Sequence, residues 1–282
     1  MPAATAGTVR EALSAATDAL AAAGTDSPRL DAELLLAEAL GADRAMLAAD
    51  PDLGVPPEAG RVFGRMVRRR VAREPVAYIV GRKGFRRIEL AVDSRVLIPR
   101  PETELLVEVA LELEPRTVLD VGTGSGAVAL AIADEIPGVE VTGTDSSSAA
   151  LEVARANADR LGLGAKVRLL EGAMIDGGDA AAIGLLVANL PYVSEAEWER
   201  LAPEIRDFEP RQALVAGPGG LEAIEALLQL LANAPEKPGA IALEVGAGQA
   251  GPVAELVAAA GFGAVERRAD LAGIERVVLG RS

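Results

Sequence analysis

The strongest constraint on the fold is a regular alternation of short apolar runs with helical stretches beyond residue 115. The runs expected to be strands lie at 117–121, 139–143, 167–170, 185–188, 240–245, 263–268 and 274–279. Helical stretches follow Gly126 and occupy 148–161, 220–233 and 249–260. Such alternation predicts a mostly parallel sheet with helices on both faces, and the last two runs predict an antiparallel edge.

The residues before this region have a different periodicity. Thr8 and Glu11 form a capping-box pattern ahead of a helix, and a second helix is expected from Ser27 to Gly41. We expect a small helical domain over 1–75, including a proline-rich turn over 51–60 and a later helix with an arginine face. Residues 76–98 then alternate in strand fashion, predicting a β-hairpin connector to an α/β domain over 99–282.

The composition excludes several kinds of chemistry. The chain of 282 residues contains no Cys and no His, which excludes thiolate nucleophiles, Ser-His triads and the usual zinc sites, so we expect no metal. No apolar run approaches the ~18 residues that a transmembrane helix needs. The N-terminal stretch lacks the pattern of a signal peptide, so we expect a cytoplasmic protein. Nothing in the sequence demands more than a monomer.

The charge is unevenly distributed. The net charge is −14, which argues against direct binding of bare nucleic acid. Residues 61–100 nevertheless hold twelve Arg and Lys against only three acidic residues. This segment is either a binding surface for an anionic or ribonucleoprotein-associated partner or a set of solvated arginines on helix and hairpin surfaces.

A glycine-rich turn is the clearest candidate for ligand binding. The strand Val118–Val121 runs into Gly122-Thr123-Gly124-Ser125-Gly126, immediately before a helix. Glycines there let backbone N–H groups approach a ligand closely, and Asp145, which closes the next strand, is placed to bind two ribose hydroxyls. Gly122, Gly124 and Ala127 also satisfy a loose dinucleotide fingerprint. An adenosine-containing cofactor is expected, and a nicotinamide enzyme remains an alternative here.

A second motif, Asn189-Leu190-Pro191-Tyr192, follows the fourth apolar run of this region. The Asn189 side chain and the Leu190 carbonyl can accept the two N–H bonds of a planar amide or amino group, and Tyr192 can stack on its plane. Acceptors that draw electron density into such a nitrogen favour its methylation without a side-chain base of neutral pKa. These four residues are the expected catalytic group.

The two motifs together resemble the amino-group class of S-adenosylmethionine-dependent methyltransferases. Further segments resemble peptide chain release factor glutamine methyltransferases and follow in that family's order: Asp31–Leu35, Arg73–Gly81, Leu97–Glu104 and Phe208-Glu209-Pro210. The resemblance covers almost the whole chain. It implies a Rossmann-like class I methyltransferase domain with a seven-stranded sheet, joined to a small N-terminal helical domain that helps to grip the substrate.

The resemblance implies transfer of a methyl group from S-adenosylmethionine to N5 of the glutamine in the Gly-Gly-Gln motif of class-one release factors. Residues 122–126 would surround the methionine end of the cofactor, Asp145 would bind its ribose, and Asn189 would contact both cofactor and substrate. Residues 189–192 would hold the glutamine amide. Arg100, Glu102 and Thr103 would form the rim of the active site.

Two positions depart from the family pattern. The family usually has proline where Leu190 stands, and leucine keeps the carbonyl acceptor but loses rigidity. Asn-Leu-Pro-Tyr also occurs in ribosomal RNA adenine dimethyltransferases, so an adenine N6-methyltransferase acting on RNA or DNA is the alternative function. Near the adenine, an acidic and an aromatic residue are replaced by Ala173 and Met174, and we expect the Met174 thioether to pack on the cofactor.

Overall fold

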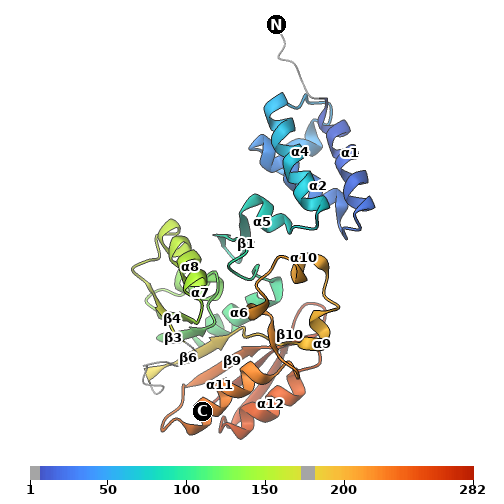
Figure 1. Ribbon diagram of the computed structural model, residues 1–282. Coiled ribbons are helices and arrows are strands. Elements are labelled where there is room, and N and C mark those ends of the chain that lie inside the picture. The colour runs from blue at the N-terminus through green and yellow to red at the C-terminus, as the bar shows by residue number, and fades with distance from the viewer. Residues whose placement is uncertain (1–6, 173–181) are drawn as a thin grey trace. The chain divides into compact units, whose positions relative to one another are not determined.

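The structure is a computed structural model of the chain and describes residues 7–172 and 182–282. It divides into two compact units, which are described separately (Figure 1). The first unit comprises residues up to 81 together with 202–208, and the second comprises 82–201 and 209–282. None of the helices within the described ranges has the length and apolar character needed to cross a membrane.

The first unit is helical. Its helices are α1 (Val9–Ala22), α2 (Pro28–Leu40), α3 (Arg44–Ala49), α4 (Pro57–Val71), α5 (Val76–Val80) and α10 (Pro203–Arg206). The predicted capping box at the start of α1 is present, because Thr8 Oγ1 accepts from the Glu11 amide and Glu11 accepts from the Thr8 amide. Apolar faces of α1, α2 and α4 form the core, including Leu13, Leu35 and Phe63.

The structure corrects three local expectations in this unit. Residues 76–80, expected to be strand-like, form α5, because Pro75 fixes a helix start and burial of Tyr78 and Ile79 outweighs their strand propensity. Helix α3 was not expected. Its six residues bury only Leu47, so no periodicity reveals it. Helix α4 begins at Pro57, inside the expected turn, with the proline at its first position.

A buried ion network joins residues 202–208 to the same unit. Arg70, 6% exposed, contacts Asp31 at 2.7 Å and Glu204 at 2.9 Å, and Arg73 contacts Glu204 at 2.6 Å. Burial raises the pKa of Glu204, but hydrogen bonds from Arg73 and Arg70 outweigh it and hold the pKa below its usual value. These pairs explain why a segment far along the chain belongs to the helical unit.

The second unit contains the predicted seven-stranded sheet. Its strands are β3 (Thr117–Val121), β4 (Glu140–Asp145), β5 (Val167–Glu171), β6 (Leu185–Ala188), β9 (Ala240–Glu244), β10 (Ala264–Ala269) and β11 (Glu275–Arg281). Their order is β10-β11-β9-β6-β3-β4-β5, and β11 runs antiparallel to both of its neighbours. The Rossmann-like α/β fold with an antiparallel edge is therefore confirmed.

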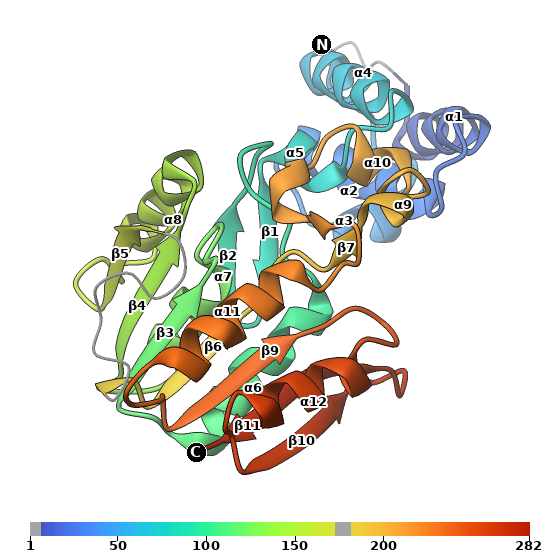
Figure 2. The ribbon, with the colours of Figure 1, turned by 60° about the horizontal axis from the view of Figure 1, so that its bottom comes forward.

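Helices cover the sheet. The main ones are α6 (Glu104–Leu113), α7 (Ala127–Glu135), α8 (Ser148–Arg160), α11 (Glu222–Asn233) and α12 (Ala250–Ala259). Figure 2 shows α11 and α12 lying across one face, where Leu227 and Val253 pack with Ile241 of β9. Shorter elements are the hairpin β1 (Arg82–Phe85) with β2 (Ile88–Ala91), the pair β7 (Val193–Ser194) with β8 (Val215–Gly217), and α9 (Glu195–Trp198).

The strand register brings three chain segments together at the carboxyl ends of the central strands. Val121 of β3 pairs with Thr144 of β4 on one side and with Ala188 of β6 on the other. The residues that follow these pairs therefore leave the sheet at the same level. The chain moves from β3 outward to β5 and then returns to β6 on the opposite side of β3. The carboxyl ends of β3 and β6 therefore form a topological switch point, where open α/β sheets bind ligands.

Candidate active site

A cavity of about 260 Å³ lies at this switch point. The glycine turn, the end of β4 and the loop after β6 contribute most of its wall. Lining residues that were predicted as site residues are Thr103, Gly122, Thr123, Gly124, Ser125, Asp145, Asn189, Leu190 and Pro191. The structure thus brings the cofactor-binding and substrate-binding candidates to one cavity.

Two predicted residues, Gly126 and Tyr192, are absent from the lining found among the described residues. Gly126 caps the start of helix α7. Met174 and Ala173 lie outside the described residues. Their predicted contact with the adenine therefore stays a prediction.

The glycine turn has a backbone conformation that side chains disfavour. Gly122, Gly124 and Gly126 have φ values of 74°, 57° and 83°, in the left-handed region. Asp145 stabilises the turn, since its carboxylate accepts from the Gly124 amide at 2.9 Å and from the Ser147 amide at 2.8 Å. The amides of Gly122 and Thr123 both donate to the Thr144 carbonyl, and the Gly126 amide donates to the Thr123 carbonyl, so the hydrogen bonds of the turn are largely internal. Because Gly122 and Gly124 have no side chains, a ligand can approach the backbone closely at this wall of the cavity.

A buried carboxyl group supports the turn from below. Asp120 is 2% exposed, and its Oδ2 accepts from the Thr123 hydroxyl at 2.7 Å and from the Ala129 amide at 3.1 Å. Burial raises the pKa of Asp120 to about 6, although these hydrogen bonds act in the opposite direction. Asp120 also lines the cavity, so its charge near neutral pH contributes to the electrostatics of the ligand site.

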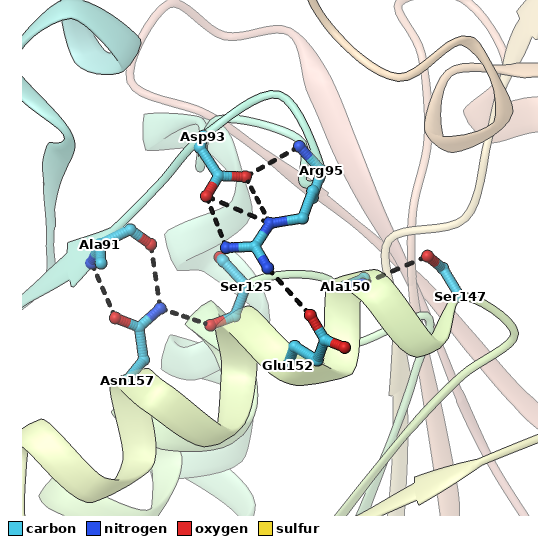
Figure 3. Close-up of polar contacts among 8 residues, drawn as sticks. All are labelled: Ala91, Asp93, Arg95, Ser125, Ser147, Ala150, Glu152 and Asn157. Atoms are coloured by element: carbon cyan, nitrogen blue, oxygen red, sulfur yellow. Dashed lines mark hydrogen bonds and ion pairs between the residues drawn. The ribbon is translucent and has the colours of Figure 1, made fainter.

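Asn157 of α8 connects the turn to the β1–β2 hairpin (Figure 3). Its side chain is fully buried, and its Oδ1 accepts from the Ala91 amide at 2.7 Å. Its Nδ2 donates to the carbonyls of Ala91 and Ser125, both at 3.0 Å. One amide side chain thereby fixes both the hairpin and the glycine turn, a role that no local sequence pattern indicates.

An arginine network lies on the wall of the cavity beside this contact (Figure 3). Arg95 lines the cavity, and its guanidinium pairs with Asp93 at 2.7 Å and with Glu152 of α8 at 3.0 Å. The hydrogen bond from Arg95 lowers the pKa of Asp93. The pairs hold the strand-to-loop segment after β2 against α8.

The segment 189–192 is held at both ends. Asn189 Nδ2 donates to the Thr103 hydroxyl at 3.1 Å, and the backbone carbonyl of Tyr192 accepts from Gln249 Nε2 at 2.9 Å. Gln249 is itself fixed, because its Oε1 accepts from the Gly246 amide at 2.8 Å. Burial and the nearby charge of Glu244 raise the pKa of the Tyr192 hydroxyl to about 12, so it stays neutral.

Leu190 is anchored through its side chain. It is 7% exposed and belongs to the apolar cluster that includes Leu119 and Leu186. A Cβ atom built on Gly122 would lie 3.4 Å from Leu190 Cδ2, so the leucine packs directly against the glycine turn. The rigidity lost with the family's proline is offset by this packing.

The predicted rim residues lie in different surroundings. Thr103 lines the cavity, whereas Arg100 pairs with the buried Glu209, which also accepts from the Ile98 amide at 3.0 Å. Glu102 lies close enough to Glu244 for its charge to raise the pKa of that group. Glu209 belongs to the Phe208-Glu209-Pro210 segment, so its contact gives that segment a structural role.

Sequence reasoning missed Glu244, the last residue of β9. Glu244 is 2% exposed, and its Oε2 has no hydrogen-bond partner among the described residues. Burial raises the pKa of Glu244 to about 7, although the nearby Thr103 hydroxyl acts to lower it. A charged residue ending an otherwise apolar run was the available signal, as it was for Asp145.

The basic segment 61–100 is largely neutralised by ion pairs. In the part of the chain that the structure describes, nine of its eleven arginines contact an acidic side chain of the same unit, as in Arg69–Glu74 at 2.6 Å and Arg86–Glu135 at 2.8 Å. The other paired arginines are Arg61, Arg70, Arg73, Arg82, Arg87, Arg95 and Arg100. Structural pairing accounts for most of the charge that motivated the nucleic-acid alternative.

Comparison with known proteins matches both parts of the chain. Residues 11–81 match the PrmC N-terminal domain, and residues 118–208 match a methyltransferase domain. The crystal structure of the hMettl16 catalytic domain in complex with MAT2A 3'UTR hairpin 6 has a TM-score of 0.57 and 14% identity. It covers 68% of this chain and 75% of that chain, and it supports the fold alone. The methyltransferase match argues against the nicotinamide alternative.

Full-length relatives identify the family. The release factor glutamine methyltransferase of Caulobacter vibrioides is 40% identical over 277 residues, covering 97% of this chain and 96% of that protein. The protein of the same name from Rhodopirellula baltica is 41% identical over 282 residues, covering 96% and 95%. The identity extends over both units of the chain. The chain belongs to the release factor glutamine methyltransferase family.

Proposed function

We propose that this protein transfers a methyl group from S-adenosylmethionine to N5 of the glutamine in the Gly-Gly-Gln motif of class-one peptide chain release factors. This protein modification would modulate translation termination, in the cytoplasm, where release factors act. The observation that carries the proposal is the position of Asn189. It directly follows β6, lies beside the glycine turn and donates from its Nδ2 to Thr103, which leaves its carbonyl oxygen for a substrate amide.

The cavity suits the proposed cofactor. Its wall combines residues 122–125 of the glycine turn, the carboxylate of Asp145 and apolar contacts from residues such as Ala150 and Leu97. The carboxylate of Asp145, which ends β4, would bind the two hydroxyls of the ribose. S-adenosylmethionine, when bound, supplies an electrophilic methyl group.

The chain's own residues must position and activate a weak nucleophile. An amide nitrogen is poorly nucleophilic because its lone pair is delocalised. Asn189 Oδ1 and the Leu190 carbonyl would accept its two N–H bonds, which draws electron density onto the nitrogen. Tyr192 would stack on the amide plane and restrict its orientation. No histidine is available as a base, and none is needed, because the methylated amide nitrogen is strongly acidic and releases its surplus proton to water.

We further propose that three segments of the chain have different functions. Residues 1–75 would recognise the release factor, 76–98 would connect, and 99–282 would bind the cofactor and perform the transfer. We expect a monomer that binds the release factor and makes no direct contact with nucleic acid.

The test is peptide mass spectrometry on a purified, unmethylated bacterial release factor incubated with the protein and S-adenosylmethionine. One added methylene on the Gly-Gly-Gln glutamine is expected, and it must be absent without the cofactor. Asn189→Ala should abolish turnover while its thermal midpoint stays unchanged. Asn233→Ala, at an exposed position at the end of α11, is the matched control. Methylation of RNA or DNA in place of the release factor would refute the proposal.

A further inference from the structure

Strand pairing places Glu244 beside Asn189. Ala188 of β6 pairs with Leu243 of β9 in the parallel ladder, so Asn189 and Glu244 are the next residues on adjacent strands. The Thr103 hydroxyl accepts from Asn189 Nδ2 at 3.1 Å, and it lies near enough to the Glu244 carboxylate to lower its pKa. The three groups form a series that leads from a buried carboxylate to the edge of the cavity.

The direction of this series follows from counting protons. A threonine hydroxyl has one proton to donate and can also accept. An ionised carboxylate only accepts, so it takes the Thr103 proton and leaves the Thr103 oxygen as an acceptor. Only the NH2 end of the Asn189 amide can then face Thr103. The Asn189 carbonyl oxygen must point the other way.

We propose that Glu244 is a positioning residue for methyl transfer, because through Thr103 it holds the Asn189 amide with its carbonyl oxygen turned toward the substrate nitrogen. The inference rests on the proposed role of Asn189 in binding the substrate amide. Glu244 itself touches neither cofactor nor substrate in this account. It acts by removing the alternative, flipped orientation of the amide.

Protonation of Glu244 removes this control. A protonated carboxyl can donate to Thr103, which frees the Thr103 proton for the Asn189 carbonyl oxygen and permits the flipped amide. The groups that act on the charge of Glu244 are Thr103, Glu102, Arg276 and Arg100, and Glu244 in turn acts on Tyr192. The pKa of Glu244 is raised to about 7, so the ionised, orienting form predominates only above neutrality.

The first experiment compares kcat and KM of wild type and Glu244→Gln with an unmethylated release factor between pH 6 and 9. Glutamine has nearly the shape of glutamate, but its NH2 group can donate to Thr103, so it does not force the Thr103 hydroxyl to donate its proton away from Asn189. We expect kcat of the variant at pH 8.5 to fall about tenfold, the size of one lost charge-assisted hydrogen bond. KM should change little, because contacts away from the reacting amide govern docking of a whole protein. The wild-type rise in kcat with pH near 7 should disappear.

Two further variants separate positioning from a structural effect. Thr103→Val breaks the series at its centre and should reduce kcat about tenfold, by the same reasoning. Thr103→Ser retains the hydroxyl and should restore near-wild-type kcat. Glu255→Gln, at an exposed site on α12, is the matched control for the charge change. Each variant should remain folded at the assay temperature and should still bind the cofactor.

A second readout needs no substrate. In ¹⁵N-labelled protein, the side-chain NH2 signal of Asn189, identified by its loss in Asn189→Ala, should shift with pH with a midpoint near that of Glu244. It should not shift in Glu244→Gln. If wild type leaves the release factor unmodified yet the signal follows Glu244, the proposed substrate is wrong and the positioning inference holds.

The inference is overturned by either of two results. One is a wild-type enzyme that methylates the release factor while Glu244→Gln retains its kcat and its pH profile. The other is an Asn189 signal that titrates identically in wild type and Glu244→Gln. In the first case the proposed function stands without this role for Glu244.

Discussion

Replacing Asn157 by leucine tests the connection between the hairpin and the glycine turn. Asn157→Leu nearly keeps the volume but removes every polar atom of a fully buried side chain. Three contacts with the hairpin and the glycine turn are lost, namely the one from the Ala91 amide at 2.7 Å and those to the Ala91 and Ser125 carbonyls at 3.0 Å. Figure 3 shows that all three converge on this one amide.

The expected cost follows from these contacts. A buried donor or acceptor left without a partner costs about 1–3 kcal/mol, and a carbonyl with a second lone pair is at the low end of that range. With one donor and two acceptors affected, the free energy of unfolding should fall by about 3–5 kcal/mol. The added apolar burial of leucine offsets only part of this. Because the Ser125 carbonyl belongs to the glycine turn, affinity for S-adenosylmethionine should also fall.

Asn157→Asp provides a pH-dependent comparison. Its carboxylate keeps the contact with the Ala91 amide but places a second oxygen against two carbonyls, which raises its folded pKa. A raised carboxyl pKa means that stability is lost as pH rises above the ordinary aspartate range. Arg160, 3.5 Å from Oδ1, reduces the effect without removing it.

The assay is urea unfolding at pH 5 and pH 8, followed by calorimetric titration of the cofactor. Asn233→Leu at an exposed position is the matched control and should change stability by less than about 0.5 kcal/mol. The reasoning is refuted if Asn157→Leu costs less than about 1 kcal/mol, below the range for a single unsatisfied buried group. It is also refuted if Asn157→Asp is equally stable relative to wild type at both pH values.

Other substitutions test the buried charges and the packing. The pKa of Asp120 is raised to about 6, so its ionisation costs the folded protein about 3 kcal/mol of stability above that pH. On acidification from pH 7 to pH 4.5, wild type should therefore gain stability relative to Asp120→Asn. An equal change in the free energy of unfolding for both proteins, measured in urea, would contradict this. Arg70→Met leaves two buried carboxylates short of a partner and should cost about 3–5 kcal/mol in chemical denaturation. The exposed Arg65→Met is its control, and equal midpoints would exclude the buried network as a source of stability. Leu190→Ala opens a void beneath the glycine turn and should cost about 2–4 kcal/mol in thermal unfolding and weaken cofactor binding, whereas Leu230→Ala at a half-exposed site should cost far less. An unchanged cofactor affinity in Leu190→Ala would show that its contact with the turn is unimportant for binding.

Local patterns along the chain determine the helices, the strands and the glycine turn. All seven strands of the sheet and the helices α7, α8, α11 and α12 lie within a few residues of their predicted positions, because apolar periodicity and caps are properties of short segments. The three glycines adopt left-handed conformations, and Asp145 stands at the end of its strand. The motif 189–192 follows β6 as predicted. Where a segment is short, as in α3, periodicity has too few residues to act on, and the prediction fails.

The contacts that hold the site in place depend on tertiary structure alone. Asn157 lies 66 residues from Ala91, and Thr103 lies 86 residues from Asn189. A buried amide or carboxylate has the same appearance in sequence as an exposed one, and only its neighbours in space decide which hydrogen bonds it makes and whether its pKa is shifted. The sheet register that sets Glu244 beside Asn189 is such a neighbour relation. Short-range chemistry therefore specifies which groups are available, and the packing of distant segments decides their orientation and charge.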